Sequence, residues 1–222
     1  METIKLDFIA TVTVLIMILG INGFFRRYHI DINGFKRGNL HTKIIYDLGH
    51  TYLPKIMFKD KFNQEIFGYV RHFVAGFPVL MALTFLEWEQ KVSFLADLGI
   101  LYIIRMIANN LTVLPSIRKC NIKEKNPFHV GGCCDLMFSG HTLTCLIATL
   151  YYLYYVSDKY TTLLLLFNFV NQFLILANRR HYSDDVFLAW FVTLTVFFIR
   201  TNEPNKVIKG LFSAVKNIFP HK

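Results

Sequence analysis

Cys134-Asp-Leu-Met-Phe-Ser-Gly-His-Thr142 and His181-Tyr-Ser-Asp-Asp185 are the two polar stretches that decide how this chain is organised. Two hydrophobic runs of membrane-span length lie between them, at residues 142–156 and 160–178, with a short polar turn where they meet. A chain that crosses a bilayer and crosses back returns to the side it left. The spacing therefore predicts that His141 and His181 lie at one membrane face, each at the end of a helix.

The second stretch has the pattern of an activated nucleophile. Asp185 follows His181 by four positions, and residues four apart share one face of a helix. A carboxylate behind an imidazole orients the ring, fixes its tautomer and makes it more basic. His141 is then placed to act as acid or base across the pocket. Asp184, three positions after His181, is the alternative partner.

The composition predicts an integral membrane protein of the all-α class. The 222 residues are 54% hydrophobic, which is high for a soluble domain, and we expect one membrane domain over residues 1–222. A polar interfacial loop is expected at 26–65 and a basic amphipathic tail at 201–222. The prediction is a bundle of six transmembrane helices, at about residues 6–25, 66–86, 92–114, 142–156, 160–178 and 185–199.

The cysteines and the net charge limit the kinds of partner. The four cysteines show no zinc-ligand spacing, so no metal site is expected, although Cys120 could pair with Cys133 or Cys134 in an oxidising lumen. The net charge is +9, but the basic residues flank hydrophobic runs instead of forming one patch. Anionic lipid headgroups are therefore expected as partners, and nucleic acid is not.

Three arginines could serve the site or only the architecture. Arg105 falls near the middle of the third expected span, where an unsatisfied arginine costs about 2.5–3.5 kcal/mol on insertion scales. It should point into the bundle, toward a polar cavity, or else form an ion pair with Asp97 or Glu87. Arg179 and Arg180 could hold phosphoryl oxygens or merely meet lipid headgroups.

The two stretches resemble the C-terminal signatures of the sphingomyelin synthase family, within the larger lipid phosphatase superfamily. Leu101-Tyr-Ile-Ile-Arg105, followed by Leu114-Pro115, is similar to the third-span signature of that family. Residues 46–55 loosely resemble its first-loop motif. The C-terminal pair is the most specific match, because both the local residues and the two-span separation agree.

The resemblance implies a catalytic triad of His141, His181 and Asp185. His181 would attack the phosphorus of a glycerophospholipid donor and expel diacylglycerol. His141 would protonate the departing oxygen and then accept the proton of the primary hydroxyl of ceramide, the acceptor. Neither a metal nor an organic cofactor is expected. Substrate-binding roles are expected for Arg105, Ser139, Gly140 and Tyr182.

Alternative functions remain open at this point. The transferred headgroup is expected to be phosphocholine or phosphoethanolamine, with inositol phosphorylceramide synthesis as a nearby alternative. The chain is less similar to the lipid phosphate phosphatases, whose pattern has an Arg-Pro pair and an arginine six positions before the nucleophile. This chain has no Arg-Pro pair, and Ile175 occupies that position, which favours headgroup transfer. A membrane transporter or lipid-binding scaffold is the non-enzymatic alternative.

The orientation of the site in the membrane is predicted from two conflicting signals. The side carrying the histidines would hold 14 Lys and Arg residues and the opposite side 8, which favours a cytosolic site. The resemblance implies a lumenal or exoplasmic site, and we follow it because phosphate binding needs cations of its own. The implied location is the Golgi, the endoplasmic reticulum or the plasma membrane. The sequence is compatible with a homo-oligomer.

Overall fold

A computed structural model of the chain describes residues 2–25, 46–56, 61–112, 137–156 and 160–218. Every regular element in these ranges is a helix, so the prediction of an all-α protein is confirmed there. In chain order they are α1 (Glu2–Phe25), α3 (Leu48–Tyr52), α4 (Lys61–Phe85), α5 (Trp88–Leu111), α6 (Gly140–Tyr155), α7 (Tyr160–Ala177), α8 (Ser183–Thr201) and α9 (Pro204–Ile218).

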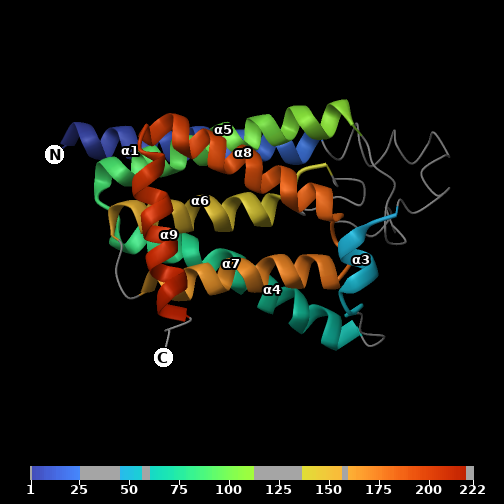
Figure 1. Cartoon of the computed structure of the whole chain (residues 1–222). Helices are drawn as coiled ribbons and strands as arrows, with labels where there is room; N and C mark the ends of the chain where they lie inside the picture. Colours follow the sequence, from blue (N-terminus) through green and yellow to red (C-terminus); the bar gives the residue numbers. More distant parts are fainter. Residues whose placement is uncertain (1, 26–45, 57–60, 113–136, 157–159, 219–222) are drawn as a thin grey trace.

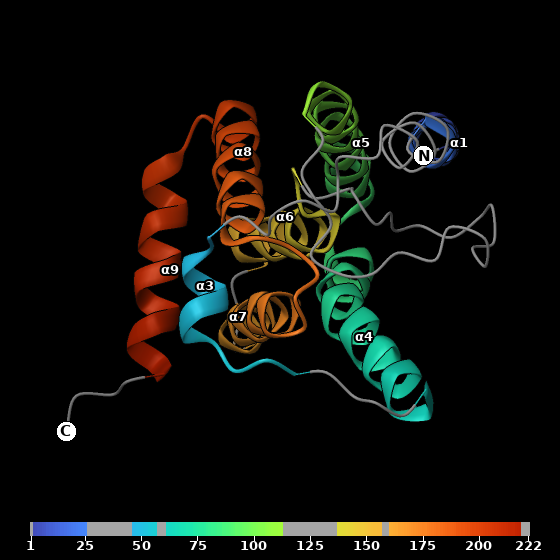
Figure 2. The same ribbon diagram turned by 90° about the vertical axis from the view of Figure 1, so that its right-hand side faces the viewer.

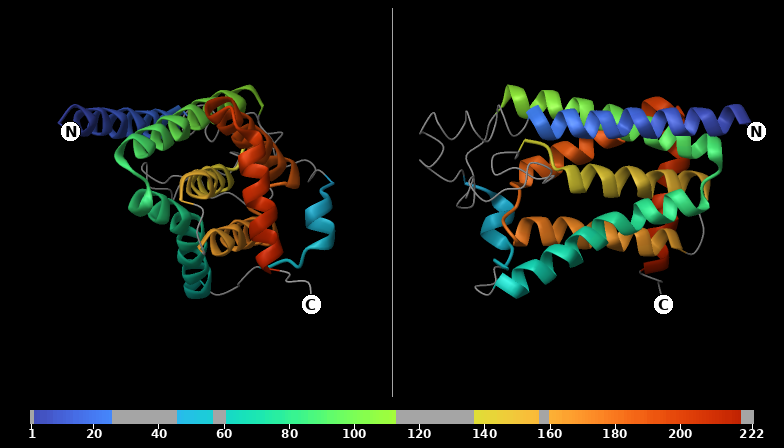
Figure 3. Two further views of the ribbon diagram at one scale, coloured as in Figure 1. Left: turned by 60° about the vertical axis from the view of Figure 1, so that its left-hand side comes forward. Right: turned by 180° about the vertical axis from the view of Figure 1, so that it is seen from behind.

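The helix α6 is the centre of the bundle. It packs against α4, α5, α7, α8 and α9, and most of its side chains are buried. The other long helices run lengthwise around it, while α9 crosses the bundle and the short α3 lies at one end (Figure 1). Figure 2 shows the same bundle from the α3 end, and Figure 3 shows α1 on its outside, packed against α5.

The core and the outer surface are both apolar. Leu101, Leu143, Ile147 and Phe197 are completely buried where α5, α6 and α8 meet. Large apolar side chains also cover the outside of the bundle, and Phe187 is 74% exposed. Such extensive exposed apolar surface is unusual for a soluble monomer and fits lipid contact.

Three helices within the described residues are long and apolar enough to cross a membrane: Phe62–Phe85, Trp88–Asn109 and Tyr160–Ala177. A shorter apolar helix covers Asp7–Ile21. The helix α6 has 16 residues, which at 1.5 Å per residue is about 24 Å, less than the roughly 30 Å of a bilayer core. The observed helices follow the six predicted spans closely, but the number that cross a bilayer stays a prediction.

A polar contact joins α5, α6 and α8 far from α3. The hydroxyl of Tyr151 donates to Oδ2 of Asp97 at 2.7 Å, and Nε of Arg200 lies 3.3 Å from the other oxygen of the same carboxylate. Asp97 is therefore engaged by Tyr151 and Arg200, and the alternative ion pair of Arg105 with Asp97 or Glu87 stays a prediction.

The predicted basic tail is a helix over most of its length. Val207 of α9 is completely buried, and Nζ of Lys206 lies 4.0 Å from the ring centroid of Tyr154 on α6. The beginning of α9 is therefore packed against the bundle. Contact of this helix with lipid headgroups stays a prediction.

Candidate active site

His141 lies in the first turn of α6, where local hydrogen bonds define the start of the helix. The side-chain oxygen of Ser139 accepts a hydrogen bond from the backbone N–H of Thr142 at 3.3 Å, and the hydroxyl groups of the two residues lie 2.9 Å apart. This is the N-cap arrangement that serine favours. Ser139 is completely buried, so its hydroxyl has a clear structural role. Its predicted role in substrate binding stays a prediction.

The two polar stretches of the sequence meet directly in the structure. The backbone N–H of Ser139 donates to the carbonyl oxygen of Asp185 at 3.4 Å, which connects the start of α6 to the start of α8. On the other side, Nδ2 of Asn171 on α7 donates to the carbonyl oxygen of His141 at 3.3 Å. Polar contacts therefore hold the beginnings of α6 and α8 together, as the spacing of the two stretches predicts.

His181 is bonded to Asp185 and not to Asp184. Nδ1 of His181 lies 3.0 Å from Oδ2 of Asp185, whose side chain is only 1% exposed. The same oxygen accepts the backbone N–H of Tyr182 at 2.9 Å, while Asp184 is exposed. Since a carboxylate only accepts hydrogen bonds, Nδ1 carries a proton, and in the neutral ring Nε2 then keeps its lone pair. That is the tautomer a nucleophilic histidine needs.

Arg105 lies beside His141, at the start of α6. Its Nε donates to the carbonyl oxygen of Phe138 at 2.8 Å. A Cβ atom added to Gly140 would stand 3.3 Å from Nε and 3.5 Å from the guanidinium carbon. Gly140 therefore lets the guanidinium approach the helix closely. The expectation that Arg105 points into the bundle is confirmed, since the residue is buried.

Two residues of α4 join this site that the sequence analysis did not select. Nδ1 of His72 lies 3.1 Å from Nε2 of His141, and the two ring centroids are 5.1 Å apart. Arg71, the preceding residue, is buried, and His141 lies within electrostatic reach of Arg71, His72, Arg105 and His181. An arginine next to a histidine inside an apolar helix was the signal that could have identified them.

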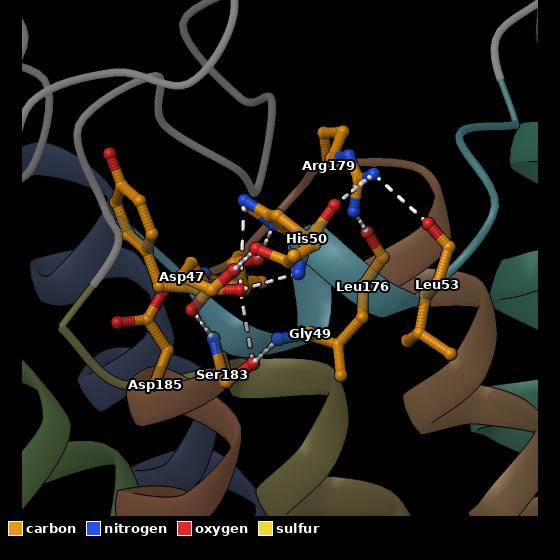
Figure 4. A network of polar contacts seen from close by, with 11 residues as sticks. Asp47, Gly49, His50, Leu53, Leu176, Arg179, Ser183 and Asp185 are labelled. Atoms are coloured by element: carbon orange, nitrogen blue, oxygen red, sulfur yellow. Dashed lines mark hydrogen bonds and ion pairs between the residues drawn. The ribbon is translucent and has the colours of Figure 1, made fainter. Parts of the chain in front are cut away.

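The loop before His181 is covered by α3 (Figure 4). The guanidinium of Arg179 is bonded to this segment: its Nη2 donates to the carbonyl oxygens of His50 at 2.7 Å and Leu53 at 3.1 Å. Neither use predicted for Arg179, phosphoryl binding or headgroup contact, matches these bonds. Arg180 donates from Nε to the side-chain oxygen of Asn178 at 3.4 Å.

Tyr182 is buried beside the predicted nucleophile. Its ring centroid lies 5.6 Å from that of His50 on α3, with the two rings tilted by 36°. The structure thus places the ring in contact with α3. Lining of a substrate pocket by Tyr182 stays a prediction.

The titratable groups of α3 are perturbed by their surroundings. Burial lowers the pKa of His50, against the opposing effect of the Asp47 charge, so His50 is neutral near pH 7. Burial would raise the pKa of Asp47, but backbone hydrogen bonds from Ser183 and His50 outweigh it, and the pKa lies below its ordinary value. Asp47 is therefore ionised at neutral pH.

Neither a reactive thiol nor a cluster of metal-binding side chains forms a second candidate site within the described residues. Cys145 is a buried free cysteine in α6, whereas Cys120, Cys133 and Cys134 lie outside the described residues, so the predicted pairing is not addressed. No group of three or more His, Cys, Asp or Glu side chains suited to a metal ion occurs within the described ranges.

The arrangement defines a class of protein. Three imidazoles, one buried carboxylate and two buried arginines lie at one end of an apolar helix bundle. The imidazole of His181 is bonded to Asp185, and that of His141 contacts His72. Such a set can attack a phosphorus atom, move a proton and hold negative charge. The class is a helical membrane protein with a cluster of imidazole, carboxylate and guanidinium groups at one end of the bundle.

Comparison with known proteins finds similarities over one part of the chain. Residues 132–202 match the family described as PAP2 superfamily C-terminal. The phosphatidylinositol:ceramide inositolphosphotransferase of Trypanosoma cruzi (strain CL Brener) is 37% identical over 79 residues, and that of Oryza sativa subsp. indica is 41% identical over 75. The human sphingomyelin synthase-related protein 1 is 37% identical over 68 residues. The resemblance to the sphingomyelin synthase family within this superfamily is therefore confirmed.

These similarities are confined to part of each chain. The alignments with the Trypanosoma and Oryza proteins cover 33% of this chain and 23% of the relatives, and the human alignment covers 29% and 16%. The matched segment contains His141, His181 and Asp185, but α3, α4 and α5 lie outside the family match.

Proposed function

We propose that this protein transfers a phospho-headgroup from a glycerophospholipid to the primary hydroxyl of ceramide and releases diacylglycerol. The observation that carries the proposal is the 3.0 Å bond between His181 and the buried carboxylate of Asp185, at the end of the bundle where His141 also lies. The family match and the names of the similar proteins support the same reaction class.

The first half of the proposed reaction forms a phosphohistidine. Nε2 of His181 attacks the phosphorus atom of the donor, and the bond from phosphorus to the diacylglycerol oxygen breaks. His141 gives a proton to that oxygen, so the leaving group departs as neutral diacylglycerol. Asp185 stabilises the positive charge that develops on the ring of His181.

The second half of the reaction regenerates the enzyme. The primary hydroxyl of ceramide attacks the same phosphorus atom, and the bond from phosphorus to Nε2 of His181 breaks. The hydroxyl proton returns to His141. The 3.1 Å contact between His72 and His141 supports a shared acid–base role, because two imidazoles can hold one proton between them and supply it or accept it in turn.

The charge of the site suits a phosphodiester. Arg71 and Arg105 are buried near His141 and would neutralise the single negative charge of a phospholipid phosphate. Arg179, which is near the nucleophile in sequence, is bonded to α3. The absence of an Arg-Pro pair, and Ile175 in place of an arginine six positions before His181, favour headgroup transfer over monoester hydrolysis.

The names of the similar proteins bear on the donor headgroup. The resemblance to the sphingomyelin synthase family favoured choline or ethanolamine, whereas several similar proteins are named as inositolphosphotransferases. We therefore put phosphatidylinositol first among the donors.

The test is a transfer assay with purified protein in lipid vesicles. The vesicles contain labelled ceramide and, in separate samples, phosphatidylinositol, phosphatidylcholine or phosphatidylethanolamine, with His181→Asn as the control. Formation of a ceramide bearing one headgroup supports the proposal and identifies the donor. Release of free phosphate from phosphatidic acid, with no transfer from any donor, would instead support a lipid phosphatase. Absence of both reactions would support the non-enzymatic alternative.

A further inference from the structure

A segment far from the family signatures makes contacts with the backbone that carries His181. The carboxylate of Asp47, the N-cap of α3, accepts the backbone N–H of His50 at 2.8 Å within its own segment. It also accepts the backbone N–H of Ser183 at 2.6 Å and the hydroxyl of Ser183 at 3.0 Å. One buried carboxylate therefore joins the start of α3 to the start of α8 (Figure 4).

Gly49 makes this close approach of α3 and α8 feasible. Its backbone N–H donates to the hydroxyl oxygen of Ser183 at 3.0 Å. A Cβ atom at this position would overlap Oγ of Ser183, so a larger residue would displace that hydroxyl or move the two segments apart. The Ser183 hydroxyl thus accepts from Gly49 and donates to Asp47, so its one proton and one of its lone pairs are bonded to this segment.

His50 reaches the predicted nucleophile itself. Its Nε2 lies 2.9 Å from the carbonyl oxygen of His181, and because a carbonyl only accepts, Nε2 is the donor. The opposite ring nitrogen, Nδ1, lies 3.7 Å from the carboxylate of Asp47. The ring also packs against Tyr182, so His50 contacts both the nucleophile residue and the one after it.

The chain before the nucleophile is held by the same segment. Arg179 has a φ of 55°, a left-handed conformation that is uncommon for residues other than glycine. Its guanidinium donates to the carbonyl oxygens of His50 and Leu53. The backbone N–H of Ile56 donates to the carbonyl oxygen of Ala177 at 2.9 Å. Residues 47–56 therefore hold the backbone on both sides of His181.

We propose that α3 is a positioning element for the nucleophile and that His50 is its positioning residue, acting through the carbonyl oxygen of His181. The inference rests on the proposed function, in which Nε2 of His181 must face a phosphorus atom. Asp185 fixes the rotation of the His181 ring, whereas α3 fixes the backbone from which the ring extends. Both are required, because reacting atoms must be placed within a fraction of an ångström.

Two substitutions at His50 separate the hydrogen bond from the packing. His50→Phe keeps a ring against Tyr182 but removes the donor to the His181 carbonyl. His50→Gln retains an amide donor at about the distance of Nε2 from the backbone. We expect kcat for ceramide transfer to fall about 10- to 100-fold in His50→Phe, with KM changed less than about threefold, and to recover to within about fivefold of the native value in His50→Gln.

A second measurement does not depend on turnover. Diethyl pyrocarbonate modifies accessible histidine rings, and mass spectrometry of the resulting peptides reports the rate at His181, which is only 9% exposed. We expect His50→Phe to increase that rate at least about threefold and His50→Gln to leave it near the native value, since a loosened backbone exposes the ring. Gly49→Ala is a second variant that should increase it by separating Gly49 from Ser183.

The outcomes distinguish the two proposals. An unchanged labelling rate in both His50→Phe and Gly49→Ala would overturn the role of α3, whatever the activity. Equal loss of kcat in His50→Phe and His50→Gln would overturn the role of the hydrogen bond. If the native protein transfers no headgroup but the labelling rates change as expected, the positioning of His181 by α3 stands and only the proposed reaction fails.

Discussion

Replacement of Asp185 by asparagine is the sharpest test of the nucleophile assignment. Asparagine has the same size, so α8 and the bundle should be preserved, but the negative charge behind His181 is lost. The 3.0 Å contact joins Nδ1 to a carboxylate that is 1% exposed, so water cannot take its place. The charge that forms on the imidazole during attack would then have no counter-charge.

The size of the effect follows from the kind of bond that is lost. Hydrogen bonds to charged groups contribute about 1.5–3 kcal/mol, which corresponds to about a 10- to 150-fold change in rate. If the asparagine presents its NH2 group, Nδ1 must accept and Nε2 becomes protonated, which is the wrong tautomer for attack. In a serine protease triad the equivalent change lowers kcat about 10⁴-fold, so we expect a loss between about 10²- and 10⁴-fold.

The assay compares Asp185→Asn with Asp184→Asn in vesicles that contain labelled ceramide and the preferred donor. Asp184 is exposed and one residue away, so its replacement controls for the removal of one negative charge from the first turn of α8. We expect Asp184→Asn to remain within about threefold of the native kcat, since surface substitutions have small effects. Near-native transfer by Asp185→Asn, or a greater loss in Asp184→Asn, would refute the assignment.

Three further predictions test the surroundings of the nucleophile. His72→Phe keeps a ring beside His141 but removes the nitrogen that contacts it. We expect kcat to fall about 10- to 100-fold and the pH–rate profile to lose one limb. An unchanged profile would exclude a shared proton. Gly140→Ala places a methyl group 3.3 Å from Nε of Arg105. KM for the donor should rise about three- to tenfold, while the midpoint of thermal unfolding stays within a few degrees of the native value. An unchanged KM would argue against phosphate binding by Arg105. The folded pKa of Asp47 is lowered, so its stabilisation of α3 is present above its unfolded pKa near 3.8 and is lost as the pH falls further. Hydrogen exchange of residues 47–56, corrected for intrinsic rates, should therefore rise below about pH 4 in the native protein, and the same pH response in Asp47→Asn would contradict this.

The sequence predicted the helices better than it predicted their contacts. Hydrophobic length located α4, α5 and α7 to within a few residues, because a membrane helix satisfies its own backbone and is recognised by length alone. The pairing of His181 with Asp185 was also predictable, since four residues along a helix define a fixed neighbour. Local periodicity was sufficient for both.

What could not be predicted depends on packing between distant segments. His72 belongs to α4, and its contact with His141 follows from the packing of α4 on α6, which hydropathy does not specify. Residues 46–55 had the composition of an interfacial loop, and nothing in them indicated contact with Ser183, more than 130 positions away. Arg179 was expected to face phosphate or lipid, but its left-handed backbone and its bonds to α3 are tertiary features.

The same polar contacts that hold the helices together also place the proposed acid. Lipid tails are as apolar as leucine, so helix association in a bilayer depends on close packing and interhelical hydrogen bonds more than on exclusion of water. The hydroxyl of Thr142, one residue after His141, donates to the side-chain oxygen of Gln172 at 2.8 Å, and Asn171 donates to the carbonyl oxygen of His141. These bonds tie α6 to α7 at the turn that carries His141. A substitution such as Gln172→Leu, which preserves the apolar packing of α7, should therefore reduce transfer more than it reduces helix content, because it loosens the position of the acid and leaves each helix intact.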